Sequence, residues 1–107
     1  MERTSRLVAR VGAEILSRLP EGAPRLAQVA QALGLPRWTL QRRLLASGVT
    51  FSDLVDATRR DLARTYLHQG GLPLADVAFS LGYSEQSAFT RAHRRWFGRP
   101  PRDNRPQ

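Results

Sequence analysis

Apolar residues recur at intervals of three and four along most of the chain, which is the period of amphipathic helices. No segment shows the strict alternation of apolar and polar residues that is typical of a half-buried strand. The first helix is expected to begin after Thr4 as its N-cap and to end before Pro20. Its apolar positions are Leu7, Val8, Val11, Ile15, Leu16 and Leu19. The pattern therefore predicts an all-α protein.

The remaining helices are short, with one exception. Thr50 and Asp53 have the spacing of a capping box and open the longest apolar pattern in the chain. Ser84 is the expected N-cap of the last helix, and a proline-broken basic tail follows that helix. Including the first helix and short turns, about seven helices are expected, with the later ones near residues 25–33, 37–47, 51–68, 74–81 and 85–97.

The two halves of the chain repeat each other. Val29, Ala30, Leu33 and Gly34 recur as Val77, Ala78, Leu81 and Gly82, an offset of 48 positions. Each half is thus a short helix, a turn with glycine and a second amphipathic helix. Small residues let two helices cross closely, and glycine permits the positive φ of a tight turn, so both halves are predicted to be helix-turn-helix units.

The second helix of each unit has a polar outer face. Successive helical residues advance by about 100°, so Leu40 and Leu44 mark the core side of the first such helix, and Phe89, His93, Trp96 and Phe97 mark that of the second. The outer faces carry side chains that can hydrogen-bond or contact base edges. These candidate DNA-binding residues are Trp38, Gln41 and Arg42 in the first unit, and Ser87, Thr90, Arg91 and Arg94 in the second. Arg43 and Arg95 lie at the flanks of these helices and are expected to contact phosphates or solvent.

The charge favours a polyanionic partner. The 107 residues carry a net charge of +8, and all 17 basic residues are arginines. A GC-rich genome explains arginine over lysine, but it does not explain the excess of base over acid. Nucleic acid is therefore favoured over a membrane surface. The chain has no long apolar run, and we expect a soluble protein located in the cytoplasm.

Catalytic and metal-binding functions have little to build on. The chain has no cysteine and only two histidines, His68 and His93, and His93 falls on an apolar face where a packed histidine is expected. No nucleophile with a neighbouring base and no phosphate-binding loop is present, so we expect neither an enzyme nor a cofactor. Arg59, Arg60 and Arg64 are interpreted as a solvated face, with phosphate contact as the alternative.

Two segments resemble the DNA-binding domain of AraC/XylS-family transcription regulators. They are VAQALGLPRWTLQRRL in the first unit and DVAFSLGYSEQSAFTRAHRRWFGRPPRDNR in the second. The resemblance covers about residues 22–105. It implies two homeodomain-like helix-turn-helix subdomains, 1–49 and 70–107, joined by a linker helix in 50–69. Their recognition helices would enter successive major grooves of double-stranded DNA. The resemblance also implies that the outer positions of these helices read bases, which adds Gln86 to the candidate residues above.

The resemblance also sets expectations about partners and about two departures. It implies an additional effector or dimerisation domain in a longer protein and RNA polymerase as a further partner. Pro36 stands where the family usually has a capping serine, and Asn104 where it usually has an aromatic residue. The alternative function is a basic helical module that binds protein or structured RNA.

Overall fold

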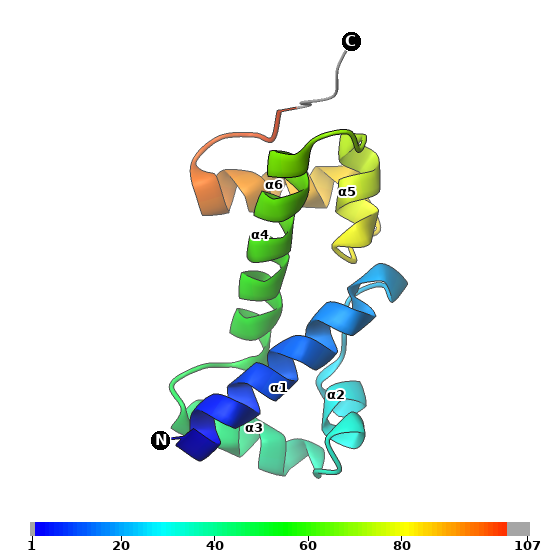
Figure 1. Ribbon diagram of the computed structural model, residues 1–107. Coiled ribbons are helices and arrows are strands. Elements are labelled where there is room, and N and C mark those ends of the chain that lie inside the picture. The colour runs from blue at the N-terminus through cyan, green and yellow to red at the C-terminus, as the bar shows by residue number, and fades with distance from the viewer. Residues whose placement is uncertain (1, 103–107) are drawn as a thin grey trace.

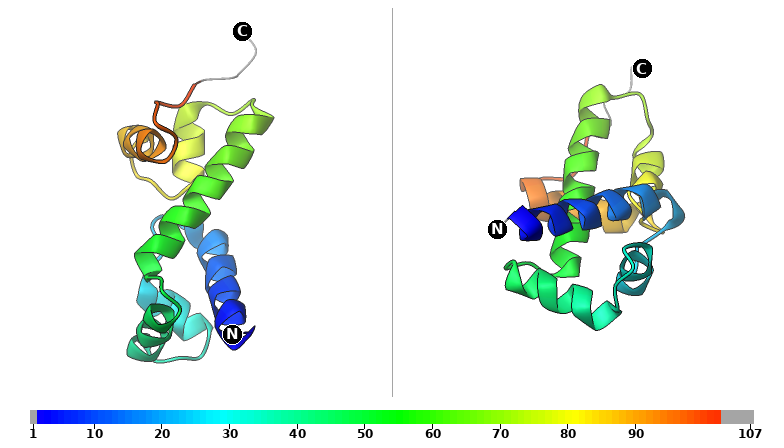
Figure 2. Two further views of the ribbon diagram at one scale, coloured as in Figure 1. Left: turned by 90° about the vertical axis from the view of Figure 1, so that its left-hand side faces the viewer. Right: turned by 60° about the horizontal axis from the view of Figure 1, so that its bottom comes forward.

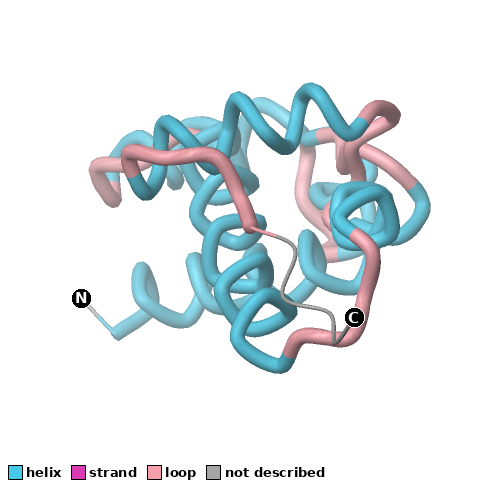
Figure 3. The backbone as a smooth tube through the Cα atoms, turned by 90° about the horizontal axis from the view of Figure 1, so that it is seen from above, coloured by secondary structure: helices cyan, strands magenta, loops and turns pink. Residues whose placement is uncertain are grey.

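The computed structural model describes the backbone of residues 2–102 and the side chains of residues 6–102. Helices joined by short loops make up this part of the chain, which contains no strand (Figure 3). The prediction of an all-α fold with about seven helices is confirmed. The elements are α1 (Glu2–Arg18), the 3-10 helix η1 (Leu19–Glu21), α2 (Leu26–Ala32), α3 (Arg37–Ala46), α4 (Phe51–Gln69), α5 (Leu74–Ser80) and α6 (Gln86–Phe97).

The long helix α4 connects the two ends of an elongated molecule measuring 49 × 24 × 20 Å. Figure 1 shows α1, α2 and α3 gathered at one end of α4, and α5 and α6 at the other. We refer to α1–α3 with η1 as the N-terminal helices and to α5 and α6 as the C-terminal helices. No helix in residues 2–102 combines the length and apolarity needed to cross a membrane.

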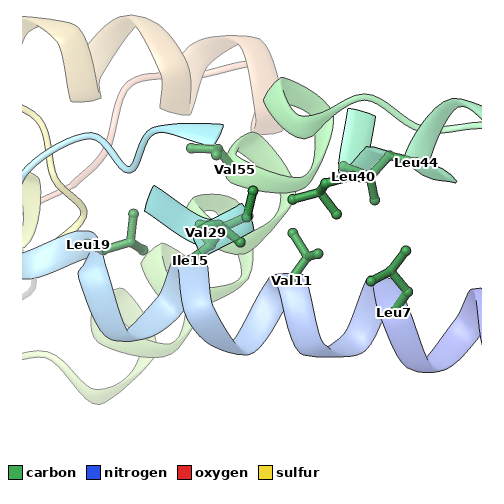
Figure 4. Close-up of a cluster of buried hydrophobic side chains, with 9 residues drawn as sticks. Leu7, Val11, Ile15, Leu19, Val29, Leu40, Leu44 and Val55 are labelled. Carbon is green, nitrogen blue, oxygen red and sulfur yellow. The ribbon is translucent and has the colours of Figure 1, made fainter. Parts of the chain in front are cut away.

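One hydrophobic core holds the N-terminal helices to the start of α4. A row of four side chains, three from α1 and Leu19 from η1, points at residues from α2, α3 and α4 (Figure 4). Burying each leucine, isoleucine or valine of this kind contributes about 1.5–3 kcal/mol, so this row contributes much of the stability of the core. The buried members are Leu7, Val11, Ile15, Leu19, Val29, Ala30, Leu40, Leu44 and Val55.

A second core lies between the other end of α4 and the C-terminal helices. It is built from Ala63 of α4 together with Val77, Ala78, Leu81 and Phe89, all buried. Leu62 of α4 packs against both cores. Consequently α4 is shared between the two ends of the molecule instead of being an exposed spacer.

The two predicted helix-turn-helix units have the same hydrogen-bonded turn. The N–H of Leu35 donates to the carbonyl of Ala30 at 2.9 Å, and the N–H of Tyr83 donates to the carbonyl of Ala78 at 3.1 Å. Both bonds span five residues and close a helix C-terminus around a glycine at positive φ, +71° at Gly34 and +87° at Gly82. The internal repeat seen in the sequence is thus a repeat of backbone geometry.

Two predicted N-caps, Thr4 and Ser84, are wrong, whereas the first helix ends before Pro20 as expected. α1 begins at Glu2, so Thr4 lies inside the helix and not at its N-cap. The segment 19–21 forms η1 around Pro20, because proline fits the first turn of a helix. Glu85, and not Ser84, occupies the N-cap position of α6. Pro36 is the N-cap of α3 without a side-chain hydrogen bond, as its identity predicts. The departure noted at Asn104 lies outside the described residues.

The capping box that opens α4 is confirmed. The hydroxyl of Thr50 accepts from the N–H of Asp53 at 3.1 Å, and the Asp53 carboxylate accepts from the N–H of Thr50 at 2.9 Å. These bonds, the one from the Thr50 backbone above all, lower the pKa of Asp53. The stability that the Asp53 carboxylate contributes is therefore complete above the pKa of the unfolded chain, and it disappears as the pH falls through the lower folded value.

We expect Thr50→Ala to lower the free energy of unfolding by about 1 kcal/mol, because one orphan N–H of α4 loses its acceptor. Thermal unfolding followed by circular dichroism measures this as a fall of about 4–8 °C in Tm. The control is Ser52→Ala in the same turn, exposed and outside the N-cap position, which should change stability by less than about 0.5 kcal/mol. Equal effects of the two substitutions would contradict the role of Thr50.

Candidate nucleic-acid interface

The second helices of the two units, α3 and α6, lie on the same side of the molecule. In the left view of Figure 2 both are seen nearly along their axes at one edge, and α1 lies on the opposite side. In Figure 1 both run from right to left. The fold therefore places the second helices of the two units on one side of the molecule, with the same chain direction.

The outer face of α3 carries the residues that the sequence places there. Leu40 and Leu44 are buried, at 0% and 1% exposure, and fix the rotation of the helix about its axis. Trp38 is 61% exposed, and Gln41, Arg42 and Arg43 are exposed as well. The expectation that Trp38 points outward and is not a core anchor is confirmed.

Trp38 and Arg42 form a stacked pair on this outer face. The guanidinium carbon of Arg42 lies 4.7 Å from the centre of the Trp38 ring. The two residues are four apart on the helix, which brings their side chains to one face. An exposed cation–π contact of this kind contributes about 0.5–1 kcal/mol and restricts the orientation of the arginine. The sequence indicated that the two residues are neighbours, but not that they are stacked.

The corresponding face of α6 is polar and basic. Phe89, Ala92 and His93 are buried, while Gln86, Ser87, Arg91 and Arg94 are exposed. The predicted outer residues of α6 are thus brought together on the same side of the helix. Thr90 is only half-buried and lies at the edge of this surface, so its methyl and hydroxyl groups are less accessible than the others.

Glu85 is a polar residue of this surface that the sequence analysis missed. It occupies the N-cap position of α6, and its carboxylate accepts a hydrogen bond from the hydroxyl of Ser87 at 3.3 Å. A carboxylate at this place repels phosphate but can accept from the amino group of a cytosine. The only available signal in the sequence was its adjacency to Gln86 and Ser87.

His93 is a packing residue, as predicted. It is 7% exposed and makes edge contacts with the rings of Phe89 and Phe97, whose centres lie 6.0 and 4.8 Å from its own. Its Nδ1 lies 2.5 Å from the carbonyl oxygen of Arg99. Since a carbonyl oxygen only accepts, Nδ1 donates, and the ring ties the segment after α6 back onto the helix.

Arg59 is not where the sequence interpretation placed it. Interpreted as solvated, it is half-buried and donates to the carbonyl oxygens of Leu81 and Gly82. The interpretation was wrong because helical periodicity identifies a face but does not show which other element covers it. Arg95 is exposed to solvent and also pairs with Asp56 of α4, a contact that the sequence did not indicate. Arg60 and Arg64 are exposed, as expected.

Trp96 is only partly buried, which corrects its assignment to the core. Its ring packs on the second core, while its indole Nε1 donates to the Asp56 carboxylate at 2.9 Å. Phe97 is also half-exposed, with the guanidinium of Arg64 5.3 Å from its ring centre. Within the part of the chain that the structure describes, no cluster of histidine, aspartate or glutamate side chains could hold a metal ion.

Comparisons with known proteins agree with this geometry. The helix-turn-helix domain family matches residues 29–107. The HTH-type transcriptional regulator VirS of Mycobacterium tuberculosis is 48% identical over 87 residues, which are 81% of this chain and 26% of VirS. The chain thus spans about a quarter of the length of this relative.

Two further matches cover most of this chain and most of the matched protein. The regulatory protein SoxS of Escherichia coli is 37% identical over 78 residues, 72% of this chain and 73% of SoxS. A crystal structure of a DNA-binding transcriptional dual regulator from Escherichia coli K-12 superposes with a TM-score of 0.83 at 25% identity, covering 89% of this chain and 85% of that one. The chain therefore belongs to the helix-turn-helix family of AraC-type transcriptional regulators.

Proposed function

We propose that this chain is the DNA-binding part of a transcription regulator and reads double-stranded DNA with α3 and α6 in successive major grooves. The observation that carries the proposal is that two turns closed by the same backbone hydrogen bond lead into two helices on one side of the molecule, each with an exposed polar face. Successive major grooves on one face of B-DNA lie about 34–36 Å apart, which fits within the 49 Å long axis. The net charge of +8 supports a phosphate-rich partner.

We assign the chain to two DNA-binding subdomains and a helix that links them. Residues 1–49 form the first helix-turn-helix subdomain, 50–69 the linker helix, and 70–107 the second subdomain with its basic tail. A location in the cytoplasm, where bacterial DNA is found, belongs to the same proposal. No residue is assigned a catalytic role.

The outer face of α3 offers three kinds of base contact. Arg42 can pair with the two acceptors of a guanine, Gln41 with an adenine, and the ring of Trp38 with a thymine methyl group. Arg43 is placed at the DNA backbone. On α6, Arg91 and Arg94 supply charged hydrogen-bond donors. Gln86, Ser87 and Thr90 supply neutral hydrogen-bonding groups.

Relatives that are longer than this chain bear on its partners. Because the chain spans 26% of VirS, we infer that an effector or dimerisation domain accompanies it in a longer protein. RNA polymerase is the partner through which a bound regulator would act, and transcription from a template with and without the selected site tests this. The alternative of a protein- or RNA-binding module receives no support from the relatives above, and a competition gel shift between duplex DNA and RNA tests it.

Selection of bound sequences from a random duplex pool is the primary experiment. The expected product is a bipartite consensus with two short motifs about one helical turn apart. Recovery of sequences without any preference would contradict sequence-specific reading.

Arg42→Ala should weaken binding to the selected site by about 1–3 kcal/mol and relax the preference at one base pair. Fluorescence anisotropy on the selected site and on each single-base variant of it measures both effects. Arg10→Ala is the charge-matched control, because Arg10 is exposed and belongs to α1, the helix that lies opposite α3 and α6 in the left view of Figure 2. Equal losses for Arg42→Ala on the selected site and on random DNA would refute base reading by Arg42.

Trp38→Ala should lower affinity for the selected site about tenfold, because the ring both contacts a thymine methyl group in the proposed complex and orients Arg42. It should change Tm little, because the ring is exposed. Leu40→Ala gives the contrasting stability effect, a loss of about 2–5 kcal/mol, since Leu40 is fully buried. A large fall in Tm with unchanged DNA affinity would show that Trp38 is a packing residue.

The logarithm of the affinity should fall linearly with the logarithm of salt concentration, with a slope of about −0.9 for each phosphate neutralised. Arg43→Ala should reduce the magnitude of this slope by about one, because it removes one backbone contact. Titrations between about 50 and 200 mM salt measure the slope. A slope that Arg43→Ala leaves unchanged would remove Arg43 from the phosphate contacts.

A further inference from the structure

Asp56 of α4 binds the end of α6 through two donors. Its carboxylate oxygens accept from Nη2 of Arg95 at 2.5 Å and from Nε1 of Trp96 at 2.9 Å. A carboxylate that receives a separate donor on each oxygen is held in direction as well as in place. The second reading helix, α6, is thereby fixed to α4 at its C-terminal end.

Arg59, one turn further along α4, binds the turn that precedes α6. Its Nε donates to the carbonyl oxygen of Leu81 at 2.7 Å and its Nη2 to that of Gly82 at 3.3 Å. Its guanidinium carbon also lies 4.1 Å from the centre of the Tyr83 ring. A cation placed on carbonyls at the C-terminal end of α5 is favourable, because these oxygens have no partner within the helix.

Gly82 makes a third contact, which does not involve α4. A Cβ atom at this position would lie 2.9 Å from the carbonyl oxygens of both Leu19 and Gly22. Leu19 is the first residue of η1, and Gly22 directly follows η1. Gly34 holds the same place in the first unit with a similar φ, yet no atom lies within 4 Å of its Cβ position. The close approach at Gly82 is therefore not a requirement of the turn and arises from contact between the two ends of the molecule.

We propose that Asp56, Arg59 and Gly82 fix the distance and rotation between α3 and α6, so that the protein accepts its two DNA motifs at a single spacing. The contacts reach α6, the turn before it and the N-terminal helices, and three contacts at different places leave little freedom for rigid-body rotation. We call these three residues the orienting residues. This inference rests on the proposed function, since spacing has meaning only for a protein that reads two motifs.

The helical form of DNA makes spacing a sensitive measure of this rigidity. One extra base pair between the motifs moves the second motif by about 3.4 Å and rotates it by about 35° around the axis. A rigid pair of reading helices cannot follow both changes, and one helix loses its base contacts. A pair joined only by a flexible connection could follow them at small cost.

The test uses the selected site and derivatives in which the segment between the motifs is one or two base pairs longer or shorter. Anisotropy titrations give the affinity of the unaltered protein and of Arg59→Ala, Asp56→Ala and Gly82→Ala for each duplex. We expect the unaltered protein to lose at least about tenfold in affinity for one inserted base pair. The three variants should lose at most about threefold, while their affinity for duplexes with one motif scrambled stays unchanged.

Two control variants test whether a loss of charge, or backbone strain at a glycine, could by itself remove the spacing penalty. Arg60→Ala removes the same charge from the neighbouring position, where the side chain is exposed and pairs only with Asp61 in the described structure. Gly34→Ala places a side chain at a similar positive φ without the clash. Both should retain the full spacing penalty, even where Gly34→Ala lowers stability.

A distance measurement keeps the inference testable if a variant binds DNA poorly. The chain has no cysteine, so spin labels at Ala46→Cys and Asp76→Cys, both exposed, report the separation of the two ends by pulsed electron resonance. A narrow distribution that broadens in Arg59→Ala but not in Arg60→Ala supports the role of the orienting residues.

The outcomes distinguish this inference from the proposed function. A bipartite consensus that the unaltered protein binds equally well at every spacing, or a penalty that all three variants retain, overturns the inference and leaves the function standing. A selection without any consensus overturns the function itself, and the label distances then decide the rigidity alone.

Discussion

The structure depends on the packing of α4 into two hydrophobic cores at once. Leu62 contacts both cores, with Val55 in the first and Ala63 in the second. Successive turns of α4 pack into different cores, so a rotation of the helix that improved packing in one core would worsen packing in the other. The short helices α2 and α5, seven residues each, are too short to be stable alone and are held by these cores. The positions of α3 and α6 therefore follow from the burial of one central helix.

The local features of this fold could be read from the sequence because each depends on neighbouring residues. The glycine turns, the Thr50 capping box and the missing cap at Pro36 are short-range arrangements with strong residue preferences. The outward direction of Trp38 followed in the same way, from its angular distance to Leu40. The N-cap of α6 was misjudged because Ser84 and Glu85 are adjacent, and residue preference alone does not locate a helix end to within one position.

Contacts between the two ends of the molecule could not be predicted, because they join residues that are far apart in sequence. Asp56 and Trp96 are 40 positions apart, and Arg59 and Leu81 are 22 apart. From the sequence alone, an arginine on the polar side of a helix is predicted to be solvated, because the element that covers it is not known. The charge excess of the chain made this error easier, because a net charge does not show that Arg59 is bound to backbone carbonyl oxygens within the protein.

The two tryptophans have opposite environments, and each belongs to a different end of the molecule. Trp38 is mostly exposed to solvent beneath a guanidinium, whereas the indole of Trp96 is half-buried and hydrogen-bonded to a carboxylate. Indole emission shifts to longer wavelength with exposure to water, so the red and blue edges of the intrinsic fluorescence spectrum arise from different residues. The protein thus carries a separate natural optical reporter on its first reading helix and at the junction that holds its second one.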